Sequence, residues 1–226
     1  KMLNIPGENL NGVYSANEFL TRVNLMHANR GDAPTPLKTG KRAIIVGGGN
    51  VAMDAARVAV RVGFESVKIV YRRTEAELPA RLEEIRHAKE EGVVFQFLHN
   101  PVELTGENGF VNKAKLEIME LGEPDESGRR SPVPTGQYVE EDVDTFIVAL
   151  GTGPNPIIQS SVSSEGLNLE TDRKGYIVID AATGKTTIDG VYAGGDVAPT
   201  GTSNAINAMG AGKRAAAAIN EYLKTK

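Results

Sequence analysis

Apolar residues in the middle of the chain form short continuous runs that alternate with helical repeats. A run of Ala, Ile and Val at 42–47 is followed by an Ala- and Val-rich segment with helical spacing at 50–63. Two further apolar runs, at 66–73 and 93–100, flank a charged helical segment at 78–92. Short apolar runs without a polar face are typical of strands buried on both faces of a parallel sheet. The pattern therefore predicts an α/β fold built on such a sheet.

The pattern changes after residue 100. Segments rich in alternating apolar and polar residues, at 114–122 and 138–150, flank a polar stretch that carries Pro and Gly. We expect a small antiparallel β-meander here, inserted before a last core strand at 145–150.

The chain beyond Gly151 changes character again. A turn-rich segment leads to predicted strands at 174–180 and 190–196 and to a closing helix at 203–224, whose many alanines allow close packing on a sheet. These elements do not complete the first sheet, so we expect them to be the end of a second domain.

The N-terminal segment contains a loop and then one helical repeat at 15–29. Ser15 is a suitable N-cap for this helix, and Glu18 three residues later completes a capping box. Pro34 and Pro36 indicate a connector after it, because proline does not fit the interior of a helix or a central strand.

Composition excludes several classes of function. The 226 residues contain 25 Lys and Arg against 29 Asp and Glu, a net charge of −4, which argues against a nucleic-acid partner. The absence of cysteine excludes disulfides and cysteine-ligated iron–sulfur clusters within the chain. No run approaches the roughly 20 apolar residues of a membrane span. We expect a soluble, cytoplasmic protein without membrane contact.

The strongest candidate site is a glycine loop between the first predicted strand and helix. Gly47, Gly49 and Ala52 fill a GxGxxA pattern in that position. The first glycine permits a tight turn, the second lets the backbone approach a pyrophosphate, and Ala52 lets the helix pack on the strand. This context predicts a Rossmann-like dinucleotide site, against the alternative of a glycine turn in an unrelated α/β protein. The candidate cofactor-binding residues are Gly47, Gly48, Gly49, Asn50 and Val51.

The end of the next strand indicates which dinucleotide is bound. An NAD site usually has an acidic residue there, but this strand ends in Arg72 and Arg73. Guanidinium groups pair well with a 2′-phosphate, so we expect NADPH and not NADH. The alternative is a pair of surface arginines matched with Glu75 or Glu77. The sequence leaves open which arginine contacts the phosphate.

A third candidate site lies near the C-terminus. Gly194 and Gly195 precede Asp196, and a helix is predicted to begin near Ser203. A carboxylate beside glycines can accept a hydrogen bond from a sugar-like hydroxyl, and a helix N-terminus offers N–H groups to an anion. On these residues alone, a turn followed by a helix cap explains the pattern equally well.

Several stretches, in order, carry a resemblance to a known family. They are IPGE at 5–8, GGGNVAMDAARVAVRVG at 47–63, VYRRTEAELPA at 70–80, GTGPNP at 151–156 and GVYAGGD at 190–196. With these stretches the sequence resembles the C-terminal half of glutamate synthase small subunits over nearly its whole length. Those proteins belong to the flavoproteins with two dinucleotide-binding domains, which also include adrenodoxin reductase and thioredoxin reductase.

The resemblance implies two cofactors, NADPH and FAD. The glycine loop and the arginines would bind NADPH, and Gly151 and Gly153 would lie in a crossover close to the nicotinamide. Asp196 would contact the ribityl–pyrophosphate chain of FAD, and main-chain groups at 204–207 would approach the isoalloxazine ring. The flavin-site residues implied in this way are Gly195, Asp196, Asn204, Ala205 and Ile206.

The resemblance also implies three parts of the chain. Residues 1–40 would be a linker and helix from the FAD-domain side. Residues 41–150 would be the NADPH-binding Rossmann-like domain with its meander, and 151–226 the C-terminal segment of a partial FAD-binding domain. In one respect the chain departs from the family, because no glycine fingerprint for FAD lies in 1–40. We expect a shortened chain or a split protein, completed by an N-terminal FAD and iron–sulfur region or by a partner such as a glutamate synthase large subunit.

The implied activity is that of an NADPH-dependent FAD oxidoreductase. Hydride would pass from NADPH to FAD, and electrons would continue to iron–sulfur partners, so the cofactors carry the chemistry. We expect no catalytic side chain and no metal site, since His27, His87 and His99 are scattered. The chain alone is expected to be inactive. The alternative is a nucleotide-binding regulatory or assembly domain without redox activity, which would have no reason to retain the segment at 190–196.

Overall fold

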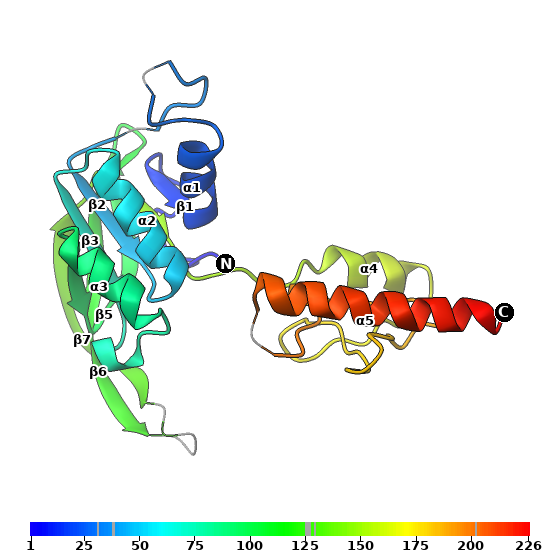
Figure 1. The fold of residues 1–226 in the computed structure, drawn as a ribbon. Coiled ribbons are helices and arrows are strands. Elements are labelled where there is room, and N and C mark those ends of the chain that lie inside the picture. The colour runs from blue at the N-terminus through cyan, green and yellow to red at the C-terminus, as the bar shows by residue number, and fades with distance from the viewer. Residues whose placement is uncertain (31, 38, 125–127, 129, 202) are drawn as a thin grey trace. The chain divides into compact units, whose positions relative to one another are not determined.

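The computed structural model describes residues 1–30, 32–37, 39–124, 128, 130–201 and 203–226. The chain forms two compact units, Lys1–Gly151 (unit 1) and Thr152–Lys226 (unit 2), which are described separately (Figure 1). Within the described residues, none of the helices has the length and apolar character needed to span a bilayer.

Unit 1 is built on a parallel sheet of five strands. In spatial order they are β1 (Val13–Ser15), β8 (Thr145–Val148), β2 (Arg42–Val46), β3 (Ser66–Tyr71) and β4 (Val94–Phe97). Every neighbouring pair in this sheet is parallel. The apolar runs recognised at 42–47, 66–73 and 145–150 are the three inner strands, and the run at 93–100 supplies β4 at one edge, which confirms the predicted Rossmann-like α/β fold.

Helices cover one face of the parallel sheet: α1 (Ala16–Asn24), α2 (Asn50–Arg61) and α3 (Leu82–Glu90) (Figure 1). A short 3-10 turn, Glu75–Glu77, precedes α3. The core on this face joins alternate strand residues, such as Ile45 and Ile69, to the helices. Helix α2 contributes four fully buried alanines to it, Ala52, Ala55, Ala56 and Ala59. Small side chains let a helix approach a sheet closely, so the start of α2 is held near the strand ends.

An antiparallel sheet covers the other face. Its strands are β5 (His99–Glu107), β6 (Phe110–Pro124) and β7 (Arg130–Asp142), and it packs on the remaining alternate strand residues of the parallel sheet. This is the predicted β-meander. Its strands are longer than expected, and the start of β5 is the end of the segment that the sequence assigned to one strand at 93–100.

The N-terminal segment belongs to unit 1 in the structure. The predicted helix is present as α1, and Ser15 is its N-cap, accepting a hydrogen bond from the Glu18 N–H over 3.1 Å. It ends five residues earlier than expected, at Asn24, and the following His27 has a φ of +53°, which a right-handed helix does not accommodate. Strand β1, which the sequence did not predict, lies at the edge of the parallel sheet beside β8. The segment expected on the flavin side is therefore part of the fold that carries the glycine loop.

Unit 2 contains two helices, α4 (Ile157–Ser164) and α5 (Ala205–Lys224), and a 3-10 turn, Gly195–Val197. The predicted closing helix is confirmed as α5. The strands predicted at 174–180 and 190–196 are wrong, because these segments form only single bridges, Thr171 with Ile177 and Lys185 with Tyr192. An apolar extended segment becomes a strand only where a neighbour supplies a continuous ladder of hydrogen bonds.

Candidate dinucleotide site

A cavity of about 890 Å³ opens in unit 1 beside the carboxyl ends of β2, β3 and β8. It is lined by the glycine loop at 47–51, by Val70–Arg73 and by Ala149–Gly151. The structure therefore brings together eight of the predicted NADPH-site residues, which the sequence places on three separate segments. The carboxyl edge of a parallel sheet is where ligands bind in open α/β folds.

Gly47 and Gly49 occupy the glycine loop for different physical reasons. Gly47 has a φ of +142°, and a Cβ there would lie 2.4 Å from the carbonyl oxygen of Ala149, so the fold itself excludes a side chain. Gly49 has an ordinary φ of −88°, and a Cβ there would meet no protein atom within 4 Å. Because Gly49 lines the cavity, the space beside it is available to a ligand.

The first turn of α2 presents unpaired N–H groups at the cavity. Its N-cap is Gly49, which has no side chain to accept a hydrogen bond. The N–H groups of Ala52 and Met53 donate to the Gly49 carbonyl, whereas no acceptor among the described residues faces those of Asn50 and Val51. Free N–H groups and the helix dipole together favour an anion at this position.

The two arginines at the end of β3 differ sharply in their surroundings. Arg72 is exposed, whereas Arg73 is only 7% exposed, and its Nε has no hydrogen-bond partner. Both line the cavity. Within the described part of the chain, neither forms an ion pair. A buried guanidinium nitrogen without an acceptor is costly, so Arg73 lacks an acceptor that its buried position requires.

The carboxylates that were the alternative partners of these arginines are engaged elsewhere. Glu75 pairs with Lys89 over 2.6 Å. Glu77 accepts from the hydroxyl and the N–H of Thr74, completing a capping box. The hydrogen bond from the Thr74 hydroxyl, more than any other influence, lowers the pKa of Glu77, so this carboxylate stays ionised in its cap. The contacts therefore do not support the alternative that Arg72 and Arg73 are surface arginines paired with Glu75 or Glu77.

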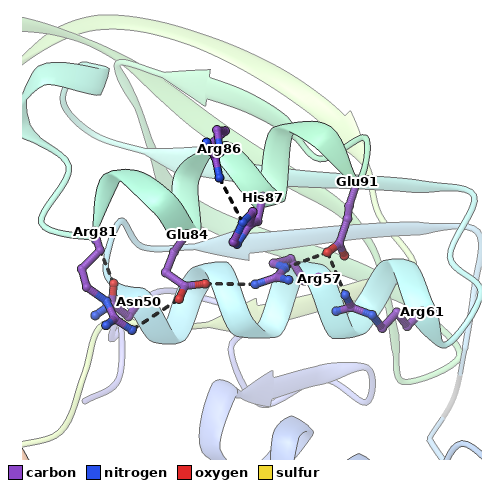
Figure 2. A network of polar contacts seen from close by, with 8 residues as sticks. All are labelled: Asn50, Arg57, Arg61, Arg81, Glu84, Arg86, His87 and Glu91. Carbon is purple, nitrogen blue, oxygen red and sulfur yellow. Dashed lines mark hydrogen bonds and ion pairs between the residues drawn. The ribbon is translucent and has the colours of Figure 1, made fainter.

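A polar network fixes the start of α2 against α3 (Figure 2). The Asn50 amide oxygen accepts from the Arg81 N–H over 2.9 Å, where α3 begins. Farther along, Arg57 donates to Glu84 over 3.0 Å and to Glu91 over 2.9 Å. The side chain of Asn50, one of the predicted cofactor-binding residues, is thus bonded to the N-cap of the neighbouring helix, which leaves its backbone N–H as the group available to a ligand.

The implied flavin-site residues all lie in unit 2. Gly195, Asp196 and Asn204 line a depression of about 10 Å³, and Ala205 and Ile206 form the first turn of α5. The Asn204 side chain caps this helix, accepting from the Asn207 N–H over 2.8 Å. Ile206 is 82% exposed. Gly153 lies in the segment that precedes α4. A depression of this size does not enclose a dinucleotide.

Sequence reasoning missed part of the cavity wall. Residues His99–Val102 at the start of β5 line it, together with Pro79 and the N-terminal residues Lys1–Leu3 and Ile5. Of these, the residues His99–Val102 carry no local motif. They reach the cavity because β5 follows β4, which lies beside β3 in the sheet, and the order of strands was not known from the sequence.

Comparisons with known proteins show the family to which the chain belongs. Residues 1–212 match the family of pyridine nucleotide-disulphide oxidoreductases. The chain is 40% identical over 190 residues to the NADP(+)-dependent formate dehydrogenase subunit beta of Moorella thermoacetica, covering 84% of this chain and 26% of that protein. It is 35% identical to the glutamate synthase [NADPH] small chain of Halomonas elongata, covering 96% and 46%. The chain thus spans less than half the length of these relatives.

Solved structures share the fold. FprA of Mycobacterium tuberculosis in complex with NADPH superposes with a TM-score of 0.74 at 22% identity, over 99% of this chain and 61% of that one. Thioredoxin reductase of Lactococcus lactis superposes with a TM-score of 0.75 at 23% identity, over 100% and 63%. With a family match across most of its length and a glycine loop in the expected cavity, the chain belongs to the pyridine nucleotide-disulphide oxidoreductase family.

Proposed function

We propose that the cavity of unit 1 binds NADPH, and that the chain is the NADPH-binding part of a flavin-dependent oxidoreductase of the glutamate synthase small-subunit type. The names of two relatives state this nucleotide, the glutamate synthase [NADPH] small chain of Halomonas elongata and the NADPH-Fe(3+) oxidoreductase subunit beta of Geobacter sulfurreducens. Family membership favours a redox role over a purely regulatory one.

The observation that carries this proposal is the buried, unpartnered Nε of Arg73 in the same cavity as the glycine loop. NADPH differs from NADH by a 2′-phosphate, which is the anion that such a guanidinium group requires. Arg72, exposed at the rim, would add a second charge to the same phosphate. The burial of Arg73 supports the proposal that it makes the desolvated contact with the phosphate.

The glycine loop would hold the pyrophosphate. The unpaired N–H groups of Asn50 and Val51 point to an anion at the start of α2, and the space beside Gly49 leaves room for it. Gly151, with a φ of +75°, follows the end of β8 at the same cavity. When bound, NADPH supplies a hydride, and the contribution of these residues is to hold and orient the nucleotide.

We propose separately that unit 2 supplies part of an FAD-binding site. Asp196 follows Gly195, which has a φ of +76°, and its exposed carboxylate is suited to accept a hydrogen bond from a flavin side-chain hydroxyl. Since the depression beside it holds about 10 Å³, FAD would be held jointly with protein that the longer relatives contain. We propose an FAD and iron–sulfur region, or a partner such as a glutamate synthase large subunit, as that complement.

Calorimetric titration of the chain with NADPH and NADH tests the nucleotide assignment. We expect tighter binding of NADPH, a loss of about tenfold or more for NADPH alone in Arg73→Ala, and a smaller loss in Arg72→Ala. Arg86→Ala, on the exposed side of α3, is the matched control and should bind both nucleotides as the unchanged chain does. Equal affinities of the unchanged chain for NADPH and NADH would contradict the proposal.

The redox part needs its own measurement. The visible absorption spectrum of the chain, purified with its native complement, is recorded before and after NADPH is added without oxygen. Bleaching of a flavin band supports electron transfer through this part. A flavin band that persists while NADPH is bound would contradict it and favour the regulatory alternative.

A further inference from the structure

His99 occupies a position beside Arg73 that the sequence did not reveal. It is the first residue of β5 and lines the cavity. The N–H of its neighbour Leu98 donates to the carbonyl of Arg73 over 3.1 Å, which places the start of β5 directly against the end of β3. His99 and the two arginines therefore line the same cavity, and the residue before His99 is bonded to the backbone of Arg73.

The hydrogen bonding of His99 fixes which ring nitrogen is available. Its Nδ1 lies 2.7 Å from the carbonyl oxygen of Phe97, and because a carbonyl only accepts, Nδ1 carries the hydrogen. No partner for Nε2 is found among the described residues. The ring is thus held by the last residue of β4, and its second nitrogen has no partner among the described residues.

We propose that His99 is a specificity-determining residue that donates from Nε2 to the 2′-phosphate of the nucleotide, between Arg72 and Arg73. This inference rests on the proposed binding of NADPH. The contact requires the doubly protonated ring, since Nδ1–H is already committed to Phe97.

The other charged groups at this wall are few. Within the described lining they are Lys1, Arg72 and Arg73, all cations. On the neighbouring strand, His99 is paired with Ile118, which is apolar. No carboxylate among the described lining residues competes with a phosphate for the imidazole.

Two nucleotide fragments separate this contact from its alternatives. Adenosine 2′,5′-bisphosphate carries the 2′-phosphate, and 5′-AMP lacks it but keeps the adenine and ribose. We expect His99→Gln to lower the affinity for the bisphosphate by about tenfold and to leave the affinity for 5′-AMP unchanged, because only a charged hydrogen bond is removed. His99→Lys, which keeps a cation, should recover part of the loss. His87→Gln, on α3 and outside the cavity lining, is the control and should change neither affinity.

Each other result overturns the inference. An equal loss for both fragments would place His99 against the adenosine, and a loss that accompanies a lower melting temperature in the absence of ligand would make its role structural. An unchanged affinity for the bisphosphate would remove His99 from the site. Arg73→Ala in the same titrations keeps the two proposals apart. If that variant loses the bisphosphate and His99→Gln does not, only the role of His99 fails, whereas no effect of either variant defeats the proposed NADPH site itself.

Discussion

The amide oxygen of Asn50 accepts a hydrogen bond from the backbone N–H of Arg81 over 2.9 Å, joining the first residue of α2 to the N-cap of α3. The bond connects two segments 31 residues apart at the point where the unpaired N–H groups of the glycine loop meet the cavity. The neighbouring helix α3 therefore helps to fix the orientation of the proposed anion site.

Removing this bond should weaken both stability and binding. We expect Asn50→Ala to lower the free energy of unfolding by about 1 kcal/mol, the usual contribution of one hydrogen bond. Because Asn50 orients the loop and does not contact the 2′-phosphate, the affinities for NADPH and for NADH should fall by the same factor. Urea denaturation and calorimetry measure the two effects. Asn17→Ala, on the exposed side of α1, is the control, and selective loss of NADPH alone in Asn50→Ala would contradict this role.

The two outer glycines of the loop should respond oppositely to substitution. Gly49→Val should cost no more than about 1 kcal/mol of stability, the range for an unfavourable N-cap, yet abolish binding of both nucleotides by filling the ligand space. Gly47→Ala should instead destabilise the fold by about 3 kcal/mol or more, because its Cβ would collide with Ala149 in a strained conformation. Thermal unfolding with and without nucleotide distinguishes them. Undisturbed nucleotide binding by Gly49→Val would refute the assignment of the loop.

Arg73 should lower the stability of the ligand-free chain while it provides the preference for NADPH. Arg73→Met removes a buried guanidinium group with an unpartnered Nε and keeps an apolar side chain in its place. We expect the ligand-free variant to gain about 1 kcal/mol in free energy of unfolding while it loses the preference for NADPH. Urea denaturation without nucleotide measures the gain, and Arg72→Met, at an exposed position, should show none. A ligand-free Arg73→Met chain less stable than the unchanged one would show that the guanidinium group is already satisfied.

Unit 1 should become less stable at acidic pH because Asp144 becomes protonated. The hydrogen bond from the Arg42 side chain is the largest influence that lowers the pKa of Asp144, and the backbone N–H groups of Arg42 and Lys41 add to it. A carboxylate whose folded pKa is depressed stabilises the fold above its unfolded pKa, and that stabilisation is lost as pH falls through the lower, folded value. The loss should therefore begin below about pH 4, the ordinary range of an aspartate.

The variant Asp144→Asn tests this dependence. It should be less stable at neutral pH by about 1 to 3 kcal/mol, as expected for hydrogen bonds to a charged group, and should lose less stability between pH 4 and pH 2. Asp172→Asn, in unit 2, is a control outside this pair. Parallel stability curves for Asp144→Asn and the unchanged chain across that range would disprove the contribution of Asp144.

The sequence was sufficient to predict an element where the residues that define it are neighbours in the chain. The strand, glycine loop and helix at 42–61 were predicted because apolar runs, the GxGxxA pattern and helical spacing all follow from neighbours in the chain. Strand β1 was missed because its three residues form a strand only by pairing with β8, some 130 residues later. The strand predicted at 190–196 is the opposite error. Its apolar residues favour a strand, but the segment forms only one bridge.

The candidate site shows the same division. That Arg72 and Arg73 belong to a cavity was predictable from their place at a strand end. Which of them is buried was not, because burial depends on how the turn after β3 packs in three dimensions. His99 carried no signal at all, since it reaches the cavity through the order of strands.

The place of β8 between β1 and β2 has a consequence for how the protein is made. A ribosome delivers β1, β2, β3, β4 and the whole antiparallel sheet before it delivers β8, so until then β1 has no neighbour and the parallel sheet is incomplete. The cavity wall at Ala149–Gly151 arrives last in unit 1. Until these residues have emerged, the nascent chain exposes apolar strand surface and lacks part of the wall of the proposed nucleotide cavity. A nucleotide bound as proposed would therefore stabilise unit 1 only after its final strand has emerged.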